Sequence, residues 1–443
     1  MPNDDMELTS LSGFSRRSGE QLRILFTEGA SLSARQSLYG LGPLHQVDVL
    51  DPDPLCQCRF SSYVRRFIRS PSFSKQPTKF LKFLAKLLAE EKYDVLLPTH
   101  EQVYLLSRVR ESIATQVGVA LPEFAVLERL QNKADFSRLL TELDLPQPAT
   151  TALRAADELA RADEFPFYLK LAHGTAGAGV WRIESRSELD RRVEVLRRNG
   201  FVGAQREILI QQPGRGVQST VQAVFNRGEI VGIHEFEARR LGVGGMSTAR
   251  TSADHPLVRE HVAQLGRHLG WHGALFIDYF YDRESGRPEY IEANPRIGET
   301  VNALLSGVNL PQLLVEVSRD QSPPSAPLGK VGVRTHSFMM ILMSMAFEGH
   351  GRGALMREIR EHAAGRGIYE NSEDELTRPH EDRLSRLPRF WIATQLLAWP
   401  GLAKKIVAKT VENYALPEMA IAEIKALPPD LYKRLVETAA TTT

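Results

Sequence analysis

The chain has 443 residues, 42% of them hydrophobic and 25% charged, which is the composition of an ordinary folded globular protein. Its 55 Lys and Arg residues nearly balance its 54 Asp and Glu residues, and the net charge of +1 argues against nucleic acid or an anionic membrane as the main partner. The length predicts about two to four domains, enough to place a site in a cleft between them. Because the charges balance, small molecules are the expected ligands.

The cysteines, the N-terminal segment and the apolar runs further limit the kind of protein that the sequence can encode. Cys56 and Cys58 are the only cysteines, which excludes a cysteine-based four-ligand zinc site and predicts free thiols in a reducing compartment. Residues 1–20 are polar, lack the apolar core of a signal peptide and are predicted to form a disordered leader. The apolar runs at 338–347 and 390–399 are half as long as the ~20 residues of a membrane-spanning helix, so we expect a cytoplasmic protein.

Residues 21–125 have the pattern of a small parallel α/β domain. A buried strand at 22–26 runs into a turn at Gly29, and a helix and the strand 46–53 follow. A basic stretch at 63–75 then leads to a helix and to a third strand at 93–101. Gly29 opens no G-x-G-x-x-G motif, which argues against a dinucleotide site.

The pattern changes between residues 126 and 330. An amphipathic helix at 132–144 is followed by a Pro-containing stretch, 145–163, that we expect to be an exposed connection. Helices are then expected only at 186–199 and 257–269, between predicted strands at 165–172, 179–185, 207–213, 217–225, 229–240 and 273–282.

Residues 331–443 begin with a strand-like segment and continue as short helices. Basic residues lie among Phe390, Trp391 and Trp399, which is compatible with a membrane surface or nucleic acid. The favoured alternative is an amphipathic helical cap that packs on the rest of the protein or on a second subunit.

The first functional signal is a lysine beside a glycine-rich turn. Lys170 ends a predicted strand and is followed by Gly174, Gly177 and Gly179 and then by another strand. Rossmann and P-loop glycines lead instead from a strand into a helix. A Gly-rich hairpin can fold its backbone N–H groups over phosphates while the lysine supplies positive charge. The alternative is a flexible β-turn beside a surface lysine.

The second signal is a predicted hairpin whose turn centres on Ser285. This centre places Asp278 opposite Glu292, and two facing carboxylates need a cation between them. Asn294 and Arg296 follow Glu292 at the strand period of two. Carboxylate and amide oxygens suit Mg²⁺, and Arg296 suits a phosphate oxygen. A charged hairpin on an exposed face remains the alternative.

A third, weaker signal lies between these two. An apolar strand turns at Pro213 and Gly214 into another strand. A connection of this kind between two lobes suits an adenine, which would pair with backbone groups near Gln211 and Gln212.

Together these residues resemble the ATP-grasp superfamily of ATP-dependent ligases, over about Leu127–Val317. The most specific element is the E-x-N-x-R sequence of Glu292, Asn294 and Arg296, which begins 14 residues after Asp278. The resemblance implies an α/β (α+β) protein: an N-terminal open parallel α/β domain at 21–125, a two-lobed ATP-grasp core at 126–330 and a mainly helical C-terminal extension at 331–443.

The resemblance also implies roles for individual residues. The residues expected to hold Mg²⁺, or Mn²⁺ in its place, are Asp278, Glu292 and Asn294. The residues expected to contact ATP are Lys133, Lys170, Gly174, Thr175, Gly177, Gln211, Gln212 and Gln218. The residues expected to act in catalysis are Arg296, Lys170 and Arg240.

The sequence also departs from the family pattern. Many members have a glutamate beside the adenine, where this chain has I-Q-Q-P-G, so Gln212 offers a hydrogen bond without a charge. Arg239, Arg240 and the turn 244–247 lie where members often place the second substrate or the acyl phosphate.

The activity implied is that of a carboxylate–amine ligase. It would activate a carboxylate as an acyl phosphate with ATP, join it to an amine or amino acid, and release ADP and phosphate. One alternative is a carboxylase or carbamoyl-phosphate-type enzyme, although we find no biotin-carrier lysine motif. The other is a non-catalytic ATP-binding regulatory module. His234 is expected to be structural, and a homodimer is the expected assembly.

Overall fold

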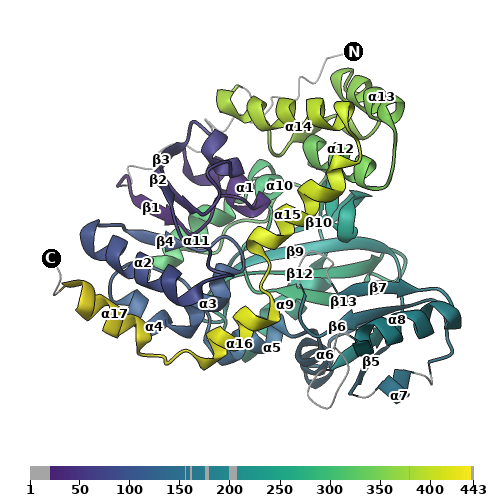
Figure 1. Ribbon diagram of the computed structural model, residues 1–443, viewed down its shortest axis with the longest axis horizontal. Coiled ribbons are helices and arrows are strands. Elements are labelled where there is room, and N and C mark those ends of the chain that lie inside the picture. The colour runs from purple at the N-terminus through teal and green to yellow at the C-terminus, as the bar shows by residue number, and fades with distance from the viewer. Residues whose placement is uncertain are drawn as a thin grey trace.

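The N-terminal part of the chain forms an open parallel sheet, as predicted (Figure 1). The computed structural model describes residues 20–154, 156–159, 162–174, 179–198, 207–378 and 380–440. The sheet order is β3-β2-β1-β4. Its strands are β1 (Arg23–Phe26), β2 (Gln46–Asp51), β3 (Val64–Arg69) and β4 (Val95–Leu97). The apolar side chains of β1, β2 and β4 are buried, because helices cover both faces of a parallel sheet. These helices are α1 (Leu32–Leu41), α2 (Pro77–Glu90), α3 (Gln102–Arg108) and α4 (Arg110–Ala114).

Strand β3 lies within the basic stretch that the sequence did not assign to an element. It is an edge strand, and none of its residues is fully buried. Its charged residues do not alternate regularly with apolar ones, as charged residues on edge strands often do not. Arg65 bonds Asp48 of the neighbouring strand, and Arg66 bonds Glu91 at 2.6 Å. Ion pairing thus stabilises a strand that hydrophobic periodicity did not reveal.

A second, smaller antiparallel sheet forms one lobe of the core. Its order is β5-β8-β6-β7. Its strands are β5 (Thr150–Leu153), β6 (Phe167–Leu171), β7 (Val180–Ile183) and β8 (Ile208–Gln211). Helices α7 (Ala156–Leu159) and α8 (Arg186–Arg198) pack on it around Phe167, Leu169 and Leu189. The stretch expected to be an exposed connection therefore contains β5 and α7, because backbone pairing with β8 orders a segment of little apolar character.

The other lobe is a seven-stranded sheet of order β13-β12-β9-β10-β11-β14-β15. Its strands are β9 (Val217–Asn226), β10 (Glu229–Leu241), β11 (Ser247–Ala253), β12 (Gly273–Asp282), β13 (Arg287–Asn294), β14 (Arg334–His336) and β15 (Ser372–Asp374). Strand β11 was not expected from the sequence. The helices around this sheet include α9 (Pro256–Leu269), α10 (Val301–Ser306) and α11 (Leu310–Ser318), and α5 (Phe124–Gln131) and α6 (Lys133–Glu142) precede the small lobe.

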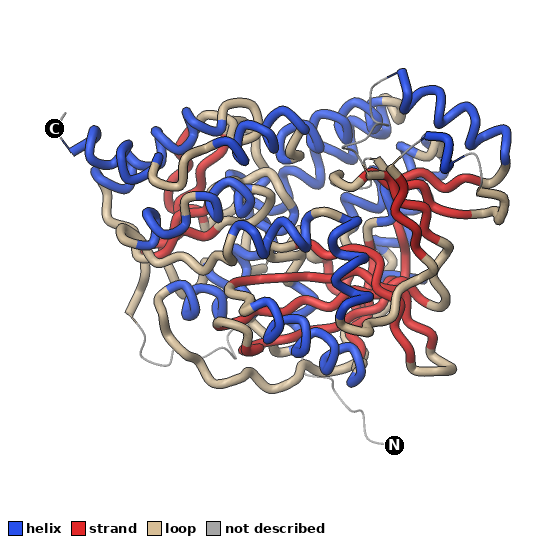
Figure 2. Tube along the Cα trace, turned by 90° about the horizontal axis from the view of Figure 1, so that it is seen from below, coloured by secondary structure: helices blue, strands red, loops and turns tan. Residues whose placement is uncertain are grey.

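The C-terminal segment is mainly helical and has two parts. Helices α12 (Phe338–Phe347), α13 (Arg352–Ala363), α14 (Arg386–Ala398) and α15 (Leu402–Tyr414) share a separate apolar cluster. Helices α16 (Glu418–Ala426) and α17 (Leu431–Ala440) return to the N-terminal unit, where α16 packs on α2 and α3 and α17 packs on α2 and α4 (Figure 1). The predicted packing of this segment on the rest of the protein is confirmed for α16 and α17. Figure 2 shows the helices lying over the strands of the sheets.

Three observations concern the sequence-based expectations about membranes, the C-terminal aromatic residues and the cysteines. None of the helices in the described ranges is long and apolar enough to cross a membrane. Phe390, Trp391 and Trp399 are 72%, 64% and 70% exposed, so they do not belong to the packed cap. Cys56 and Cys58 are buried free thiols, as predicted.

Candidate functional site

The two carboxylates expected to face each other do so. In the β12–β13 hairpin, Asp278 is the cross-strand partner of Glu292. The pairing changes register between Asp278 and Tyr279, since Tyr279 pairs with Tyr290 and Ile291 is the extra residue of a β-bulge. The bulge therefore aims Glu292 at Asp278, and the predicted opposition is confirmed.

Asp278 lies in an environment that disfavours its negative charge. Burial, together with the nearby carboxylates of Glu292 and Glu299, raises its pKa to about 7. The Thr220 hydroxyl donates a hydrogen bond to Asp278 Oδ1 at 2.6 Å, and the Asn294 amide nitrogen lies 3.4 Å from the other oxygen. Positive charge beside this carboxyl group favours its ionised form at neutral pH.

Part of this positive charge comes from Lys133 at the start of α6. The side chain of Asn132 caps the helix by accepting hydrogen bonds from two N–H groups of the first turn. The cap fixes Lys133 as the first helical residue. Its ammonium group lies 3.0 Å from Glu292 Oε1 and donates to the carbonyl oxygen of Gly174 at 3.1 Å. Lys133 thus links the carboxylates to the start of the Gly-rich turn.

Lys170 lies on β6 and is almost fully buried. Its ammonium group donates to Gln211 Oε1 at 2.5 Å, and Gln211 in turn donates to Thr150 Oγ1. Burial lowers the pKa of Lys170 to about 8, while Glu292 and Asp278 favour its charged form. This hydrogen bond connects Lys170 to Gln211, on the strand that is expected to contact the adenine.

Arg296 connects this site to the N-terminal unit. Its Nε donates to Glu101 Oε1 at 3.2 Å, and its guanidinium lies over the ring of Phe276 at 5.0 Å. Gln131 donates to the other oxygen of Glu101 at 3.0 Å. Sequence reasoning missed Glu101 because it lies 195 residues before Arg296 in another unit.

Among known proteins the chain has distant relatives, but no family model matches it. The chain is similar to the carbamoyl phosphate synthase large chain of Pyrococcus furiosus, with 25% identity over 206 residues. The match covers 44% of this chain and 19% of that protein, so the chain spans far less than two thirds of that relative.

Three solved structures resemble most of the chain. The carboxyaminoimidazole ribonucleotide synthase of Aspergillus clavatus, solved with ATP, has a TM-score of 0.58 at 15% identity and covers 85% of this chain and 99% of its own. An L-amino acid ligase from Bacillus licheniformis has a TM-score of 0.52 at 16% identity and covers 69% and 76%. The biotin carboxylase domain dimer of Hydrogenobacter thermophilus 2-oxoglutarate carboxylase, solved with MgADP and bicarbonate, has a TM-score of 0.56 at 14% identity and covers 71% and 74%.

The chain has the ATP-grasp fold. The identities are too low to transfer a reaction, and the printed activities differ among these proteins. The likeness therefore shows the fold of this ATP-grasp chain, and its reaction has to be argued from its residues.

The oxygen-rich end of the β12–β13 hairpin suits a magnesium ion. Asp278, Glu292 and Asn294 offer hard oxygen ligands at one place on two paired strands. The raised pKa of Asp278 and the ammonium group of Lys133 beside Glu292 both indicate that this end of the hairpin requires cationic partners. The donor set suits magnesium, and the metal-binding role of these three residues remains a prediction.

The remaining predicted site residues have other contacts. The Gln218 side chain donates to the carbonyl oxygen of Gly245 at 2.7 Å and so holds the short 3-10 turn Val243–Gly245. Arg240 pairs with Glu358 of α13 at 2.7 Å, which directs its charge toward the C-terminal segment. The backbone N–H of Gln212 donates to Ala149. The roles of these residues remain predictions.

Thr175 and Gly177, and with them most of the expected phosphate flap, lie outside the described residues. His234 is buried and its Nε2 lies 2.8 Å from Asn302 Oδ1. Burial lowers the pKa of His234 to about 4, and its structural role remains a prediction.

Arg250 on the unexpected strand β11 is a second residue that sequence reasoning missed. It is almost fully buried and pairs with Glu299 at 2.9 Å and with Glu375 at 3.0 Å. Glu299 follows β13 and its charge acts on Asp278. Arg250 therefore connects the edge of the carboxylate site to the C-terminal segment.

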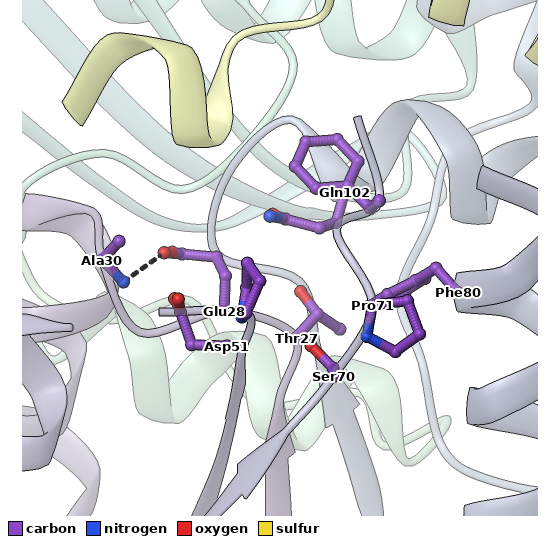
Figure 3. Close-up of a pocket in the computed structure, with 10 residues that line it drawn as sticks. Thr27, Glu28, Ala30, Asp51, Ser70, Pro71, Phe80 and Gln102 are labelled. Atoms are coloured by element: carbon purple, nitrogen blue, oxygen red, sulfur yellow. Dashed lines mark hydrogen bonds between the residues drawn. The ribbon is translucent and has the colours of Figure 1, made fainter. Parts of the chain in front are cut away.

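A separate hollow lies at the carboxyl ends of β1 and β2 (Figure 3). Thr27 Oγ1, Ser70 Oγ and Gln102 Oε1 line it as buried oxygens that have no hydrogen-bond partner in the described parts of the chain. The carboxylates of Glu28 and Asp51 also line it, and backbone N–H groups already bond both. The unpaired oxygens make this hollow suited to water or a polar ligand.

Proposed function

We propose that this ATP-grasp chain is an ATP-dependent carboxylate–amine ligase. The observation that carries the proposal is the convergence of Asp278 and Glu292 with three cationic groups, those of Lys133, Lys170 and Arg296. Two facing carboxylates surrounded by buried cations suit a metal-bound polyphosphate better than an uncharged ligand.

The first half of the proposed reaction is the transfer of a phosphoryl group from ATP to a carboxylate. A carboxylate oxygen of the acid substrate attacks the γ-phosphorus of ATP, and the bond from that phosphorus to the bridging oxygen breaks as ADP leaves. Lys170 and Arg296 are assigned to the transferring phosphoryl group, where they stabilise its negative charge. Magnesium, when bound, would neutralise part of the negative charge of the phosphates.

In the second half of the reaction, the amine attacks the carbonyl carbon of the acyl phosphate. The carbon–oxygen bond to phosphate breaks, phosphate leaves with the bonding electrons, and the amine loses a proton. Water would hydrolyse the acyl phosphate, so exclusion of water by closure of the small lobe is expected to protect it.

Magnesium as the ATP partner is supported by the donor set and by the MgADP bound to the carboxylase relative. An L-amino acid ligase shares the fold, so the fold accommodates the proposed reaction, which itself rests on the charges of the site. The same carboxylase relative was solved as a dimer, and we propose a homodimer here on that basis.

A second candidate is phosphorylation of bicarbonate, as the first step of a carboxylation or of carbamoyl phosphate synthesis. It is favoured by the sequence match to carbamoyl phosphate synthase. It uses the same site residues and differs only in the acid that attacks ATP.

One assay separates these candidates. ADP and phosphate release from MgATP is measured with bicarbonate or with a panel of carboxylic acids, each with and without amino acids as amines. Release that requires both an organic acid and an amine supports the ligase, whereas release with bicarbonate alone supports the second candidate. Bound ATP with no turnover in any mixture would leave a non-catalytic regulatory module.

A further inference from the structure

A cluster of potential metal ligands lies in the C-terminal segment, which the proposed reaction does not use. His336 ends β14 and Asp374 ends β15, and the two residues are direct partners in the parallel pairing of these strands. Partners in adjacent strands project from the same face of a sheet. His362, in the last turn of α13, completes the group, and one ligand atom from each residue lies within 4.8 Å of the others.

Two of the three residues hold buried atoms that lack a partner. His336 Nε2 and Asp374 Oδ2 are buried and have no hydrogen-bond partner within the described ranges. The remaining polar atoms of both side chains are used, since His336 Nδ1 lies 2.9 Å from Ser372 Oγ and Asp374 Oδ1 accepts two backbone N–H bonds. An unpaired buried polar atom costs about 1–3 kcal/mol, so two such atoms in one cluster indicate a missing partner.

The bond to Ser372 also orients the His336 ring. A proton on Nδ1 satisfies that bond and leaves the lone pair of Nε2 free, as in metal-binding histidines whose other ring nitrogen is held by a neighbouring acceptor. His362 is held from the other side, because its ring stacks on Phe338 with centroids 3.9 Å apart. These neighbours restrict the orientation of both rings, so that only small rotations bring their nitrogens to one ion.

The neighbouring arginine does not satisfy the buried carboxylate oxygen. Arg389 Nη1 lies 4.0 Å from Asp374 Oδ2, at the limit of an ion pair and beyond hydrogen-bonding distance. This oxygen is thus left for another cationic partner.

We propose that His336, His362 and Asp374 form a binding site for a divalent first-row transition metal ion of the Zn²⁺ class. Two imidazole nitrogens and one carboxylate oxygen suit zinc, whose ligands lie at about 2.0–2.2 Å, with water in the remaining position. The ligand atoms must approach one another by about 1–1.5 Å to reach one ion, which side-chain rotation supplies. The ion joins α13 to the edge of the seven-stranded sheet.

The site is distinct from the oxygen site of Asp278 and Glu292, which prefers magnesium. Titration of the full-length, metal-stripped protein with Co²⁺ in millimolar Mg²⁺ therefore probes the histidine site alone. We expect one Co²⁺ per chain, a visible absorption band of four- or five-coordinate cobalt, and its displacement by one Zn²⁺. Zinc is also expected to raise the thermal midpoint.

The variant His362→Gln tests the assignment with little risk to the fold, because this ring is only partly buried. We expect at least a 10-fold loss of Co²⁺ affinity and no thermal shift with zinc. Asp374→Asn is expected to give the same result while it keeps the shape of the side chain. The matched control is His350→Gln, since exposed His350 lies outside the cluster, 3.8 Å from Glu348, and the variant is expected to bind as the wild type does. A folded wild-type protein that takes up no metal, or His362→Gln with unchanged binding, overturns the proposal.

Discussion

The ammonium group of Lys133 lies 3.0 Å from a carboxylate oxygen of Glu292, which is itself the cross-strand partner of Asp278. The contact joins the first turn of α6 to the β12–β13 hairpin. A lysine in this place neutralises a carboxylate that a metal ion would otherwise neutralise. We therefore expect Lys133 to exchange Glu292 for a phosphate oxygen when MgATP binds.

The first prediction concerns Glu292. Replacing it with Gln keeps the size of the side chain and removes one of the two facing charges. We expect kcat/KM to fall by about 100-fold or more, because transition-state charge is left uncompensated. The free energy of unfolding is expected to change by no more than about 1 kcal/mol, since Glu292 is partly exposed and glutamine keeps a hydrogen-bond acceptor for the buried Lys133. ADP release and urea unfolding measure the two effects.

The matched control is Glu289→Gln, three residues earlier on β13, whose carboxylate faces exposed Arg215. This variant is expected to keep the activity of the wild type. Equal losses in the two variants would contradict a specific role for Glu292 in metal and phosphate binding.

The second prediction concerns Glu101, the residue through which the N-terminal unit holds Arg296. Glu101→Gln keeps a hydrogen-bond acceptor for Arg296 but removes the charge. We expect kcat to fall by about 10-fold with a smaller change in the KM for ATP, because the guanidinium is positioned less firmly. Arg296→Lys is expected to lose more, since lysine cannot form the planar contacts of arginine. Steady-state kinetics distinguish these outcomes, and an unaltered kcat in Glu101→Gln would contradict the positioning role.

Contacts of the site could be predicted from the sequence only where the two residues lie close together along the chain. Asp278 and Glu292 lie in one hairpin, so local turn geometry was enough to bring them together. Glu101 and Arg250 were missed because their partners, Arg296, Glu299 and Glu375, lie in distant segments that only tertiary packing brings close. The same applies to the pairing of Arg240 with Glu358, which no local pattern reveals.

The fold shows a similar division. The buried strands of the parallel sheet and the long hairpins were predicted because their apolar residues are continuous or alternate. Strands β3 and β11 were missed because β3 is rich in arginine and β11 consists mainly of small polar residues. Backbone pairing with neighbouring strands, rather than side-chain hydrophobicity, determines both.

The third prediction separates function from stability at Lys170. Burial disfavours the charge of this lysine, so Lys170→Met is expected to leave the free energy of unfolding within about 2 kcal/mol of the wild type. The KM for ATP is expected to rise and kcat to fall, with a combined loss of about 100-fold, because the transferred phosphate loses a charged contact. Lys86→Met, on the exposed surface of α2, serves as the control. Strong destabilisation without a specific kinetic defect would indicate a structural lysine instead.

The final prediction concerns the contact between α1 and the C-terminal segment. Arg35 and Asp382 form a buried ion pair at 3.0 Å, and Asp382 also accepts hydrogen bonds from Ser61 and Ser62. Burial opposes the charge of Asp382, but these hydrogen bonds and Arg35 outweigh it, so the pKa of Asp382 is lowered. Removing the charge leaves the guanidinium buried and unpaired. Asp382→Asn is therefore expected to lower the free energy of unfolding at pH 7 by about 3–5 kcal/mol.

The control for this pair is Asp320→Asn. Asp320 pairs with Arg227 at 2.7 Å, a shorter distance, but both side chains are exposed, so a loss below about 1 kcal/mol is expected. Because the folded-state pKa of Asp382 is lowered, its contribution is present above the ordinary Asp pKa of about 3.9 and is lost as the pH falls through the lower folded value. Urea unfolding of the wild type and both variants at pH 7 and under acid conditions measures these differences. Equal effects of the two substitutions would show that burial does not set the strength of the pair.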